Sequence, residues 1–205
     1  MTLTIKAILP PKRPNGRAAV VFDDGTTVKL LPQTVAEQGL FPGMELTDAA
    51  LASLKSANAA VSAKQRAVRI ISAAAVSKGE LRQRLTQKGE TPEDAQNAVR
   101  WLEELNLLDD AETARQIVSR GVSRGYGVER IKQMLYAKRI PKEYWDEALA
   151  TVPDMSDALE EFLRKRLGPE PDEKTLRSAT QAAIRRGFTW TDVREALEQI
   201  KKTDA

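Results

Sequence analysis

The chain has 205 residues, of which 41% are hydrophobic and only 5% aromatic, so a core must be built largely from aliphatic side chains and Ala. It contains no Cys and no His, which excludes disulfides, ordinary zinc fingers and Ser-His-Asp or Cys-His catalytic centres. The net charge is +3, and no apolar run approaches the roughly 20 residues that span a bilayer, so we expect a cytoplasmic protein.

Residues 1–60 differ in character from the rest and are predicted to form a small β-hairpin followed by a short helix. The apolar runs Leu3–Leu9 and Arg17–Phe22 precede the turn signal Asp23-Asp24-Gly25, and Thr26–Leu31 follows it. Thr47-Asp48 then opens the Ala-rich stretch Ala49–Ser56. Two interpretations of this extension are open: an appendage that stabilises the fold, or a contact to nucleic acid or to a protein filament.

From about residue 62 the chain is helical, and comparison with itself at shifts of 50 and 48 residues indicates three repeats. The positions that align are Leu81, Ile131 and Ala179; Leu85, Leu135 and Ala183; Ala98, Ala148 and Ala196; and Leu102, Val152 and Ile200. Their helical spacing predicts the buried stripes of two successive helices. A helix precedes each pair, over Gln65–Ala75, Ala111–Arg124 and Ser156–Leu167. The fold predicted is mainly α, with three tandem three-helix-bundle repeats in an elongated curved array.

The ends of these helices carry recognisable signals. Thr91, before Pro92, and Thr189 are predicted helix N-caps, and Ser77 with Glu80 fits a capping box. A basic link joins the last two helices of each repeat: Lys88-Gly89, Lys138-Arg139 and Arg186-Gly187. Gly in this place predicts a left-handed cap, and Arg139 would lose about 1 kcal/mol if it adopts the same backbone. The basic links either offset helix dipoles or contact a partner.

Positive charge is concentrated between Arg115 and Arg139. This segment holds seven basic residues and one acid, Glu129, so it carries +6 while the rest of the chain carries −3. Such bias is typical of a phosphate-binding surface, although a solvated helix face or a contact to an acidic protein surface would also explain it. Tyr126, in the flexible turn Arg124–Gly127, is a candidate for stacking on a base. The candidate DNA- or partner-binding residues are Arg115, Arg120, Arg124, Tyr126, Arg130, Lys132, Lys138, Arg139, Lys88, Arg185 and Arg186.

No constellation of catalytic or metal-binding residues is found. Asp109 and Asp110 together suggest a metal site, but a cap for the helix that begins near Ala111 is the better interpretation. We therefore expect no cofactor, no metal and no enzymatic activity.

Together the motifs resemble the RecX family of RecA regulators. The resemblance covers about residues 64–200 and is carried by Glu80–Leu85 with Lys88-Gly89, Leu105–Asp110, Ser123–Ile131 and Arg185–Thr189. The N-terminal hairpin is similar to an extension that some members carry. Two positions depart from the family pattern: Arg139 stands where Gly is frequent, and Ile117 where Trp is frequent.

The resemblance implies a protein that binds in the groove of the RecA filament on single-stranded DNA, and we expect the protein to be a monomer. Family members dampen strand exchange, ATP hydrolysis and the coprotease activity behind the SOS response, and the family has no catalytic residues. Domain boundaries are expected at 1–60, 61–108, 109–154 and 155–205. The alternative function is a duplex-DNA-binding transcriptional regulator, because three-helix units can mimic helix-turn-helix modules.

Overall fold

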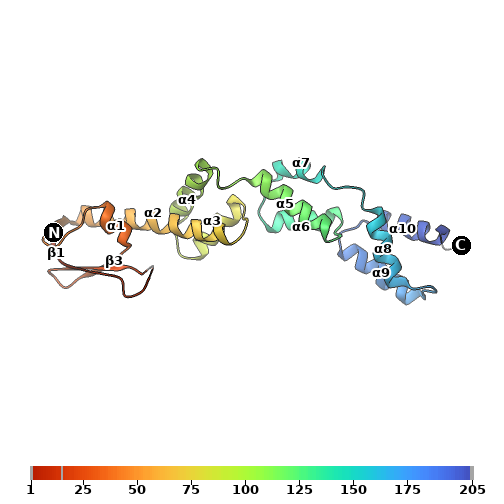
Figure 1. The fold of residues 1–205 in the computed structure, drawn as a ribbon, viewed down its shortest axis with the longest axis horizontal. Helices are drawn as coiled ribbons and strands as arrows, with labels where there is room; N and C mark the ends of the chain where they lie inside the picture. The colour runs from red at the N-terminus through yellow and green to blue at the C-terminus, as the bar shows by residue number, and fades with distance from the viewer. Residues whose placement is uncertain (1, 15, 204–205) are drawn as a thin grey trace. The chain divides into compact units, whose positions relative to one another are not determined.

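The computed structural model describes residues 2–14 and 16–203 as a mainly helical protein with a small sheet in its N-terminal part (Figure 1). The chain divides into two compact units. Unit 1 consists of Met1–Ala74 with Leu81–Leu107, and unit 2 consists of Ala75–Glu80 with Leu108–Ala205. Among the described residues, no helix is both long and apolar enough to span a membrane.

The sheet of unit 1 is antiparallel, with the strand order β3-β2-β1-β4. Its strands are β1 (Thr2–Leu9), β2 (Ala18–Phe22), β3 (Thr27–Leu30) and β4 (Glu45–Thr47). The predicted Asp-Gly hairpin is confirmed as β2–β3, with Gly25 at a φ of +85° in its turn. The sheet is larger than the predicted hairpin, because β1 pairs with both β2 and β4. Strand β4 has only three residues, too few to show the alternation of apolar and polar residues by which a strand is predicted from sequence.

The sheet packs on the first part of a long helix. Buried side chains from β1, β2, β3, β4 and helix α2 form one cluster: Ile5, Val20, Phe22, Leu30, Leu46 and Leu54. Thr47 caps α2 (Asp48–Ala73) by accepting a hydrogen bond from the backbone N–H of Ala50. The short helix α1 (Pro32–Glu37) is tied to α2 by Asn58, whose side-chain oxygen accepts from the backbone N–H of Leu31 at 2.7 Å.

The prediction of two separate helices over Ala49–Ser56 and Gln65–Ala75 is wrong, because α2 runs through both. The intervening residues 57–64 contain neither Gly nor Pro, and five of the eight are Ala or Val, which a helix accommodates. The polar Asn58 is buried against α1, so it supports the helix there and does not end it. Position 60/61, where a domain boundary was expected, therefore lies inside one helix.

The three tandem three-helix repeats are present. They comprise the C-terminal part of α2 with α3 (Lys78–Gln87) and α4 (Pro92–Glu104); α5 (Asp110–Ser123), α6 (Val128–Ala137), the 3-10 turn η1 (Lys142–Tyr144) and α7 (Trp145–Leu149); and α8 (Ser156–Leu167), α9 (Glu173–Arg185) and α10 (Trp190–Thr203). In the middle repeat the third helix is short. Pro141 begins a 3-10 turn there, and Pro153 removes a backbone donor soon after α7.

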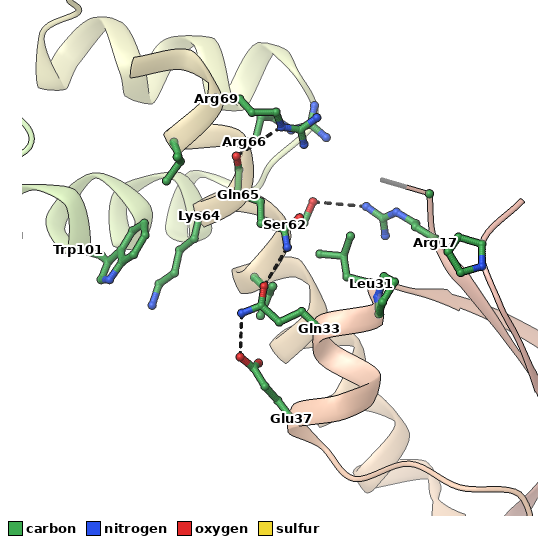
Figure 2. A pocket seen from close by; sticks show the side chains of 15 residues that line it. Arg17, Leu31, Gln33, Glu37, Ser62, Lys64, Gln65, Arg66, Arg69 and Trp101 are labelled. Atoms are coloured by element: carbon green, nitrogen blue, oxygen red, sulfur yellow. Dashed lines mark hydrogen bonds between the residues drawn. The ribbon is translucent and has the colours of Figure 1, made fainter. Parts of the chain in front are cut away.

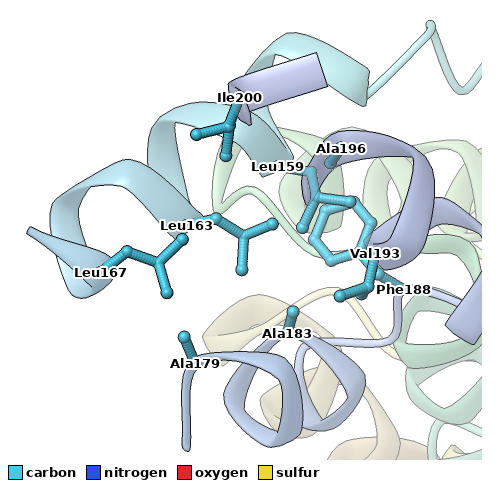
Figure 3. Close-up of a cluster of buried hydrophobic side chains, with 9 residues drawn as sticks. All are labelled: Leu159, Leu163, Leu167, Ala179, Ala183, Phe188, Val193, Ala196 and Ile200. Carbon is cyan, nitrogen blue, oxygen red and sulfur yellow. The ribbon is translucent and has the colours of Figure 1, made fainter. Parts of the chain in front are cut away.

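The aligned apolar positions are buried as predicted, except Val152, which is only partly buried. Leu81 and Ile131 are fully buried, and so are Leu85, Leu135 and Ala183. Figure 3 shows the cluster of the third repeat, in which side chains of α8, α9, α10 and the link between α9 and α10 point toward one another: Leu159, Leu163, Leu167, Ala179, Ala183, Phe188, Val193, Ala196 and Ile200. Burial of each large aliphatic side chain contributes about 1.5–3 kcal/mol, and this holds each repeat together.

The predicted helix ends are confirmed. Thr91 accepts a hydrogen bond from the N–H of Asp94 at 3.0 Å, and Thr189 accepts from the N–H of Asp192 at 3.1 Å. All three links adopt the left-handed conformation, with φ of +89° at Gly89, +54° at Arg139 and +92° at Gly187. Arg139 therefore takes the conformation that was expected to cost it about 1 kcal/mol.

Two of these links pack against an earlier segment of unit 2 in which a helix begins. The carbonyl of Arg186 accepts a hydrogen bond from the N–H of Gly127 at 2.9 Å, and the carbonyl of Gly187 accepts from the N–H of Glu129 at 3.1 Å. In the same way, the hydroxyl of Ser77 donates to the carbonyl of Lys138. Gly127 and Ser77 both immediately precede the middle helix of a repeat. In both cases, therefore, the link of one repeat contacts the start of the middle helix of the preceding repeat.

Gly187 is expected to tolerate no side chain. A Cβ there would collide with the backbone nitrogen of Arg130, whereas at Gly89, which has nearly the same φ, nothing lies within 4 Å. We expect Gly187→Ala to destabilise unit 2 by about 2–4 kcal/mol, and Gly89→Ala to cost unit 1 only about 1 kcal/mol. Hydrogen exchange measured by mass spectrometry on peptides from α6, α9 and α3 resolves the two effects. Equal losses at both sites would show that the contact with Arg130 is unimportant.

Candidate nucleic-acid interface

The structure divides the basic residues of the segment Arg115–Arg139 into paired and unpaired groups. Arg115 contacts Glu112 at 3.0 Å and Glu147 at 3.2 Å, and Lys132 contacts Glu129 at 2.8 Å. Hydrogen bonds from Gln116 and from Arg115 lower the pKa of Glu112 below its ordinary value. The acids that face this segment come partly from outside it, so the charge of +6 counted along the sequence overstates the free positive charge.

Lys138 is half-buried and holds the segment Ser77–Glu80 in place. Its ammonium group lies 3.0 Å from a carboxylate oxygen of Glu80, and its carbonyl accepts the hydroxyl of Ser77. Ser77 in turn accepts the N–H of Glu80 at 3.0 Å, which confirms it as a cap. Arg139 follows in the left-handed turn, and its Cβ and carbonyl lie against Gly79. The link of the middle repeat is thus a packing element, and Lys138 is not available to a phosphate without breaking this pair.

Arg186 contacts the end of α5 in a comparable manner. Its guanidinium donates to the carbonyl of Arg124 at 2.7 Å and to the carbonyl of Gly125 at 3.3 Å. These carbonyls follow directly after the last residue of α5, at the helix end where the dipole favours a cation. One side chain of the third repeat therefore caps a helix of the second.

The same guanidinium lies between two aromatic rings in an alternating stack that crosses the two repeats. Arg186 lies 5.6 Å from the ring centre of Tyr126 and 4.6 Å from that of Phe162. Arg130 lies 6.0 Å from the ring of Tyr126, and Arg166 lies 4.6 Å from the ring of Phe162. We call this set the arginine–aromatic stack: Arg130, Tyr126, Arg186, Phe162 and Arg166. Each such contact contributes about 0.5–1 kcal/mol at exposed positions.

The candidate residues predicted from the sequence include neither Phe162 nor Arg166. Phe162 is only partly buried and packs against the edge of the third-repeat cluster, which leaves its ring in contact with both arginines. The i, i+4 spacing of Phe162 and Arg166 on α8 was a usable signal, because such residues share a helix face. Tyr126 already has Arg130 and Arg186 over its ring, so a base could stack on it only by displacing one of them.

The exposed arginine set comprises Arg120, Arg124 and Arg185, whose side chains are exposed and have no ion pair among the described residues. Arg120 and Arg124 lie one turn apart at the end of α5, and Arg185 ends α9 next to Arg186. Of the predicted site, the structure therefore brings Tyr126, Arg130 and Arg186 together at the turn after α5, where Arg186 also binds the carbonyl of Arg124. Lys88 belongs to unit 1 and is exposed.

Asp109 and Asp110 have separate structural roles. Asp109 caps α5 by accepting the N–H of Glu112 at 3.0 Å, and the buried Asp110 accepts the N–H of Lys78 at 2.9 Å. Within the described part of the chain, no group of three or more acidic side chains is arranged to hold a metal ion. The interpretation of Asp109 as a helix cap is confirmed.

Comparison with known proteins identifies the family to which this chain is similar. A model of the first three-helix domain of RecX matches residues 63–102, and a model of the second three-helix domain of RecX matches residues 109–149. Regulatory protein RecX of Chromohalobacter salexigens is 33% identical over 135 residues, which cover 64% of this chain and 88% of that protein. The chain belongs to the RecX family.

Other RecX proteins extend the likeness to the N-terminal part. Regulatory protein RecX of Clostridioides difficile is 25% identical over 208 residues, covering 98% of this chain and 97% of its own. A crystal structure of regulatory protein RecX covers 96% of this chain and 99% of its own with a TM-score of 0.68 at 19% identity. That of RecX from Lactobacillus salivarius covers 71% and 98%, with a TM-score of 0.61 at 18% identity. This chain therefore shares its fold with both structures. With the first of them, the similarity includes the N-terminal part that contains the sheet.

Replacing Arg186 should loosen the two repeats of unit 2. Lys keeps the charge but has neither the planar group that stacks between Tyr126 and Phe162 nor two donors in a fixed fork. We expect Arg186→Lys to lower the free energy of unfolding of unit 2 by about 1–2 kcal/mol. The adjacent, exposed Arg185→Lys serves as the control and should change it by less than about 0.5 kcal/mol. Urea denaturation followed by circular dichroism compares them, and equal midpoints would contradict the role assigned to Arg186.

Proposed function

We propose that this protein is a regulator, mainly an inhibitor, of the RecA recombinase. It binds the RecA filament on single-stranded DNA and dampens strand exchange, ATP hydrolysis and the coprotease activity of the SOS response. Membership of the RecX family supports this assignment, together with the arginine–aromatic stack that joins the second and third repeats. The protein acts in the cytoplasm as a monomer, by binding and not by catalysis, and needs no cofactor.

The contact surface we propose consists of the exposed arginine set and the outer members of the stack. Arg120, Arg124 and Arg185 are exposed and have no ion pair with any residue that the structure describes, so their charges are available to phosphates or to acidic RecA side chains. Arg130 is held over Tyr126 and donates to Gln133 at 3.0 Å, which keeps it near the same turn. A repeat array lying along the filament groove would exclude the second DNA and hinder the subunit movements of the ATP cycle.

Reversing the charge of this surface should weaken inhibition. We expect Arg120→Glu with Arg124→Glu to raise the concentration that half-inhibits RecA strand exchange by about tenfold or more, because repulsion replaces attraction at two contacts. Arg194→Glu with Lys201→Glu makes the same change in net charge on α10, at exposed residues outside the surface, and should leave inhibition unchanged. Undiminished inhibition by the first variant, with its circular dichroism intact, would refute the placement of the contact.

Salt dependence separates DNA contacts from protein contacts. If about five phosphates of a single strand are neutralised, the logarithm of the binding constant should fall with the logarithm of salt concentration with a slope near −3.5. Fluorescence anisotropy of a labelled oligothymidylate across a salt series measures this slope without RecA. A flat response would instead assign the arginines to an acidic protein surface.

A further inference from the structure

Unit 1 contains a basic groove that the proposed surface on unit 2 does not include (Figure 2). Its cavity volume is about 1020 Å³, and its walls come from the loop between β1 and β2, from α1, from the middle of α2 and from α4. The lining residues that matter here are Arg17, Glu37, Lys64, Arg66, Arg69 and Trp101. Because these residues come from four separate segments, only the folded unit brings them together.

The groove is strongly biased toward positive charge. Four basic side chains line it, and Glu37, which accepts a hydrogen bond from Gln33 at 2.8 Å, is its one acidic lining residue among those described. Lys12 and Arg13 are exposed in the adjoining loop and add further positive charge. A concave surface of one sign concentrates oppositely charged ligands, so the chemistry of the groove favours a polyanion.

Its basic residues have different roles. Arg66 lies 2.8 Å from the buried Glu90 and donates to the carbonyl of Lys88 at 2.9 Å, so it is committed to holding α2 against the link of the first repeat. Among the described residues, Arg17 donates one hydrogen bond, to the hydroxyl of Ser62 at 3.4 Å, and Arg69 donates one, to the carbonyl of Gln65, also at 3.4 Å. These are long, weak hydrogen bonds, and neither arginine forms an ion pair within the described part of the chain. Arg17 and Arg69 therefore retain their charge for a ligand.

Trp101 adds an aromatic surface to the groove. The ammonium group of Lys64 lies 5.1 Å from the centre of the Trp101 ring, and Figure 2 shows the two side chains next to each other on the side of α2 and α4. A cation beside a partly exposed indole offers a phosphate partner and a stacking platform at the same point. Gln65 of α2 donates to the side-chain oxygen of Gln33 of α1 at 2.9 Å, and this bond fixes the two walls relative to each other.

We propose that this groove binds single-stranded DNA, with Arg17, Lys64 and Arg69 on phosphates and Trp101 on a base. Cationic grooves with an aromatic platform bind single strands because unpaired bases expose their faces, whereas the bases of a duplex are already stacked on one another. The inference names a second DNA contact for the proposed RecA regulator, but it does not depend on RecA. It also assigns the N-terminal extension a ligand in addition to its structural role.

The test compares neutralised variants in binding to a fluorescein-labelled oligothymidylate of about 20 nucleotides, measured by anisotropy without RecA. Arg17→Gln with Arg69→Gln should weaken binding about tenfold and make the salt slope shallower by about 1.4, which corresponds to two lost phosphate contacts. The matched control, Lys29→Gln with Lys55→Gln, removes the same charge from exposed residues of unit 1 outside the groove. It should keep both the affinity and the slope of the wild type.

The aromatic contact has its own variants. Trp101→Leu should weaken binding to the oligothymidylate about tenfold, and Trp101→Phe should restore most of it, because a phenyl ring still stacks. A duplex of the same length should show no difference between these two variants. Thermal unfolding of each variant checks that unit 1 is intact.

The outcomes distinguish this proposal from the proposed function. If the groove variants bind the oligothymidylate as the wild type does, the groove is not a DNA site, whatever the variants at Arg120 and Arg124 do to RecA. If they bind DNA normally but fail to inhibit RecA, the groove contacts an acidic protein surface and the proposal is overturned. If the groove variants lose DNA binding while neither the wild type nor any variant inhibits RecA, the groove is a DNA site and the proposed function is wrong.

Discussion

The peptide groups of the links in unit 2 pack against the first turn of an earlier helix, and this contact determines where the arginines lie. The N–H groups at the start of a helix have no acceptor within the helix, and leaving them buried without one costs about 1–3 kcal/mol each. The carbonyls of Arg186 and Gly187 accept two of these N–H groups at the start of α6. The guanidinium of Arg186 meanwhile donates to carbonyls at the end of α5. One link therefore satisfies both ends of the turn between α5 and α6.

This double contact requires a backbone that most residues avoid. The carbonyls can reach the helix start only if the link turns into the left-handed region, and the close approach leaves no space for a Cβ at Gly187 or at Gly127. At the middle link, Arg139 takes the same turn, and there the partner presents a serine hydroxyl that reaches further than a backbone N–H. The longer reach of Ser77 fits a link that has a side chain at the left-handed position.

Much of the fold followed from the sequence because its determinants are local. Helical periodicity, the caps at Thr91, Asp109 and Thr189, and the alignment of Arg139 with two glycines all depend on residues a few positions apart. The candidate site was predicted less well. Lys138 and Arg186 were correctly picked out as recurring basic residues, but their partners lie about 60 positions away, and spacing along the chain gives no sign of such contacts. The basic groove of unit 1 was missed for the same reason, because its walls come from four segments.

The arginine–aromatic stack reduces the conformational entropy that its arginine side chains would lose when a ligand binds. A free arginine side chain loses up to about 2 kcal/mol of rotamer entropy when it is immobilised, and three flexible arginines would lose it together. Arg130, Arg166 and Arg186 are already restricted by the rings of Tyr126 and Phe162 before anything binds. Association with a charged surface therefore begins from a preorganised array, and a larger share of each electrostatic contact remains as affinity.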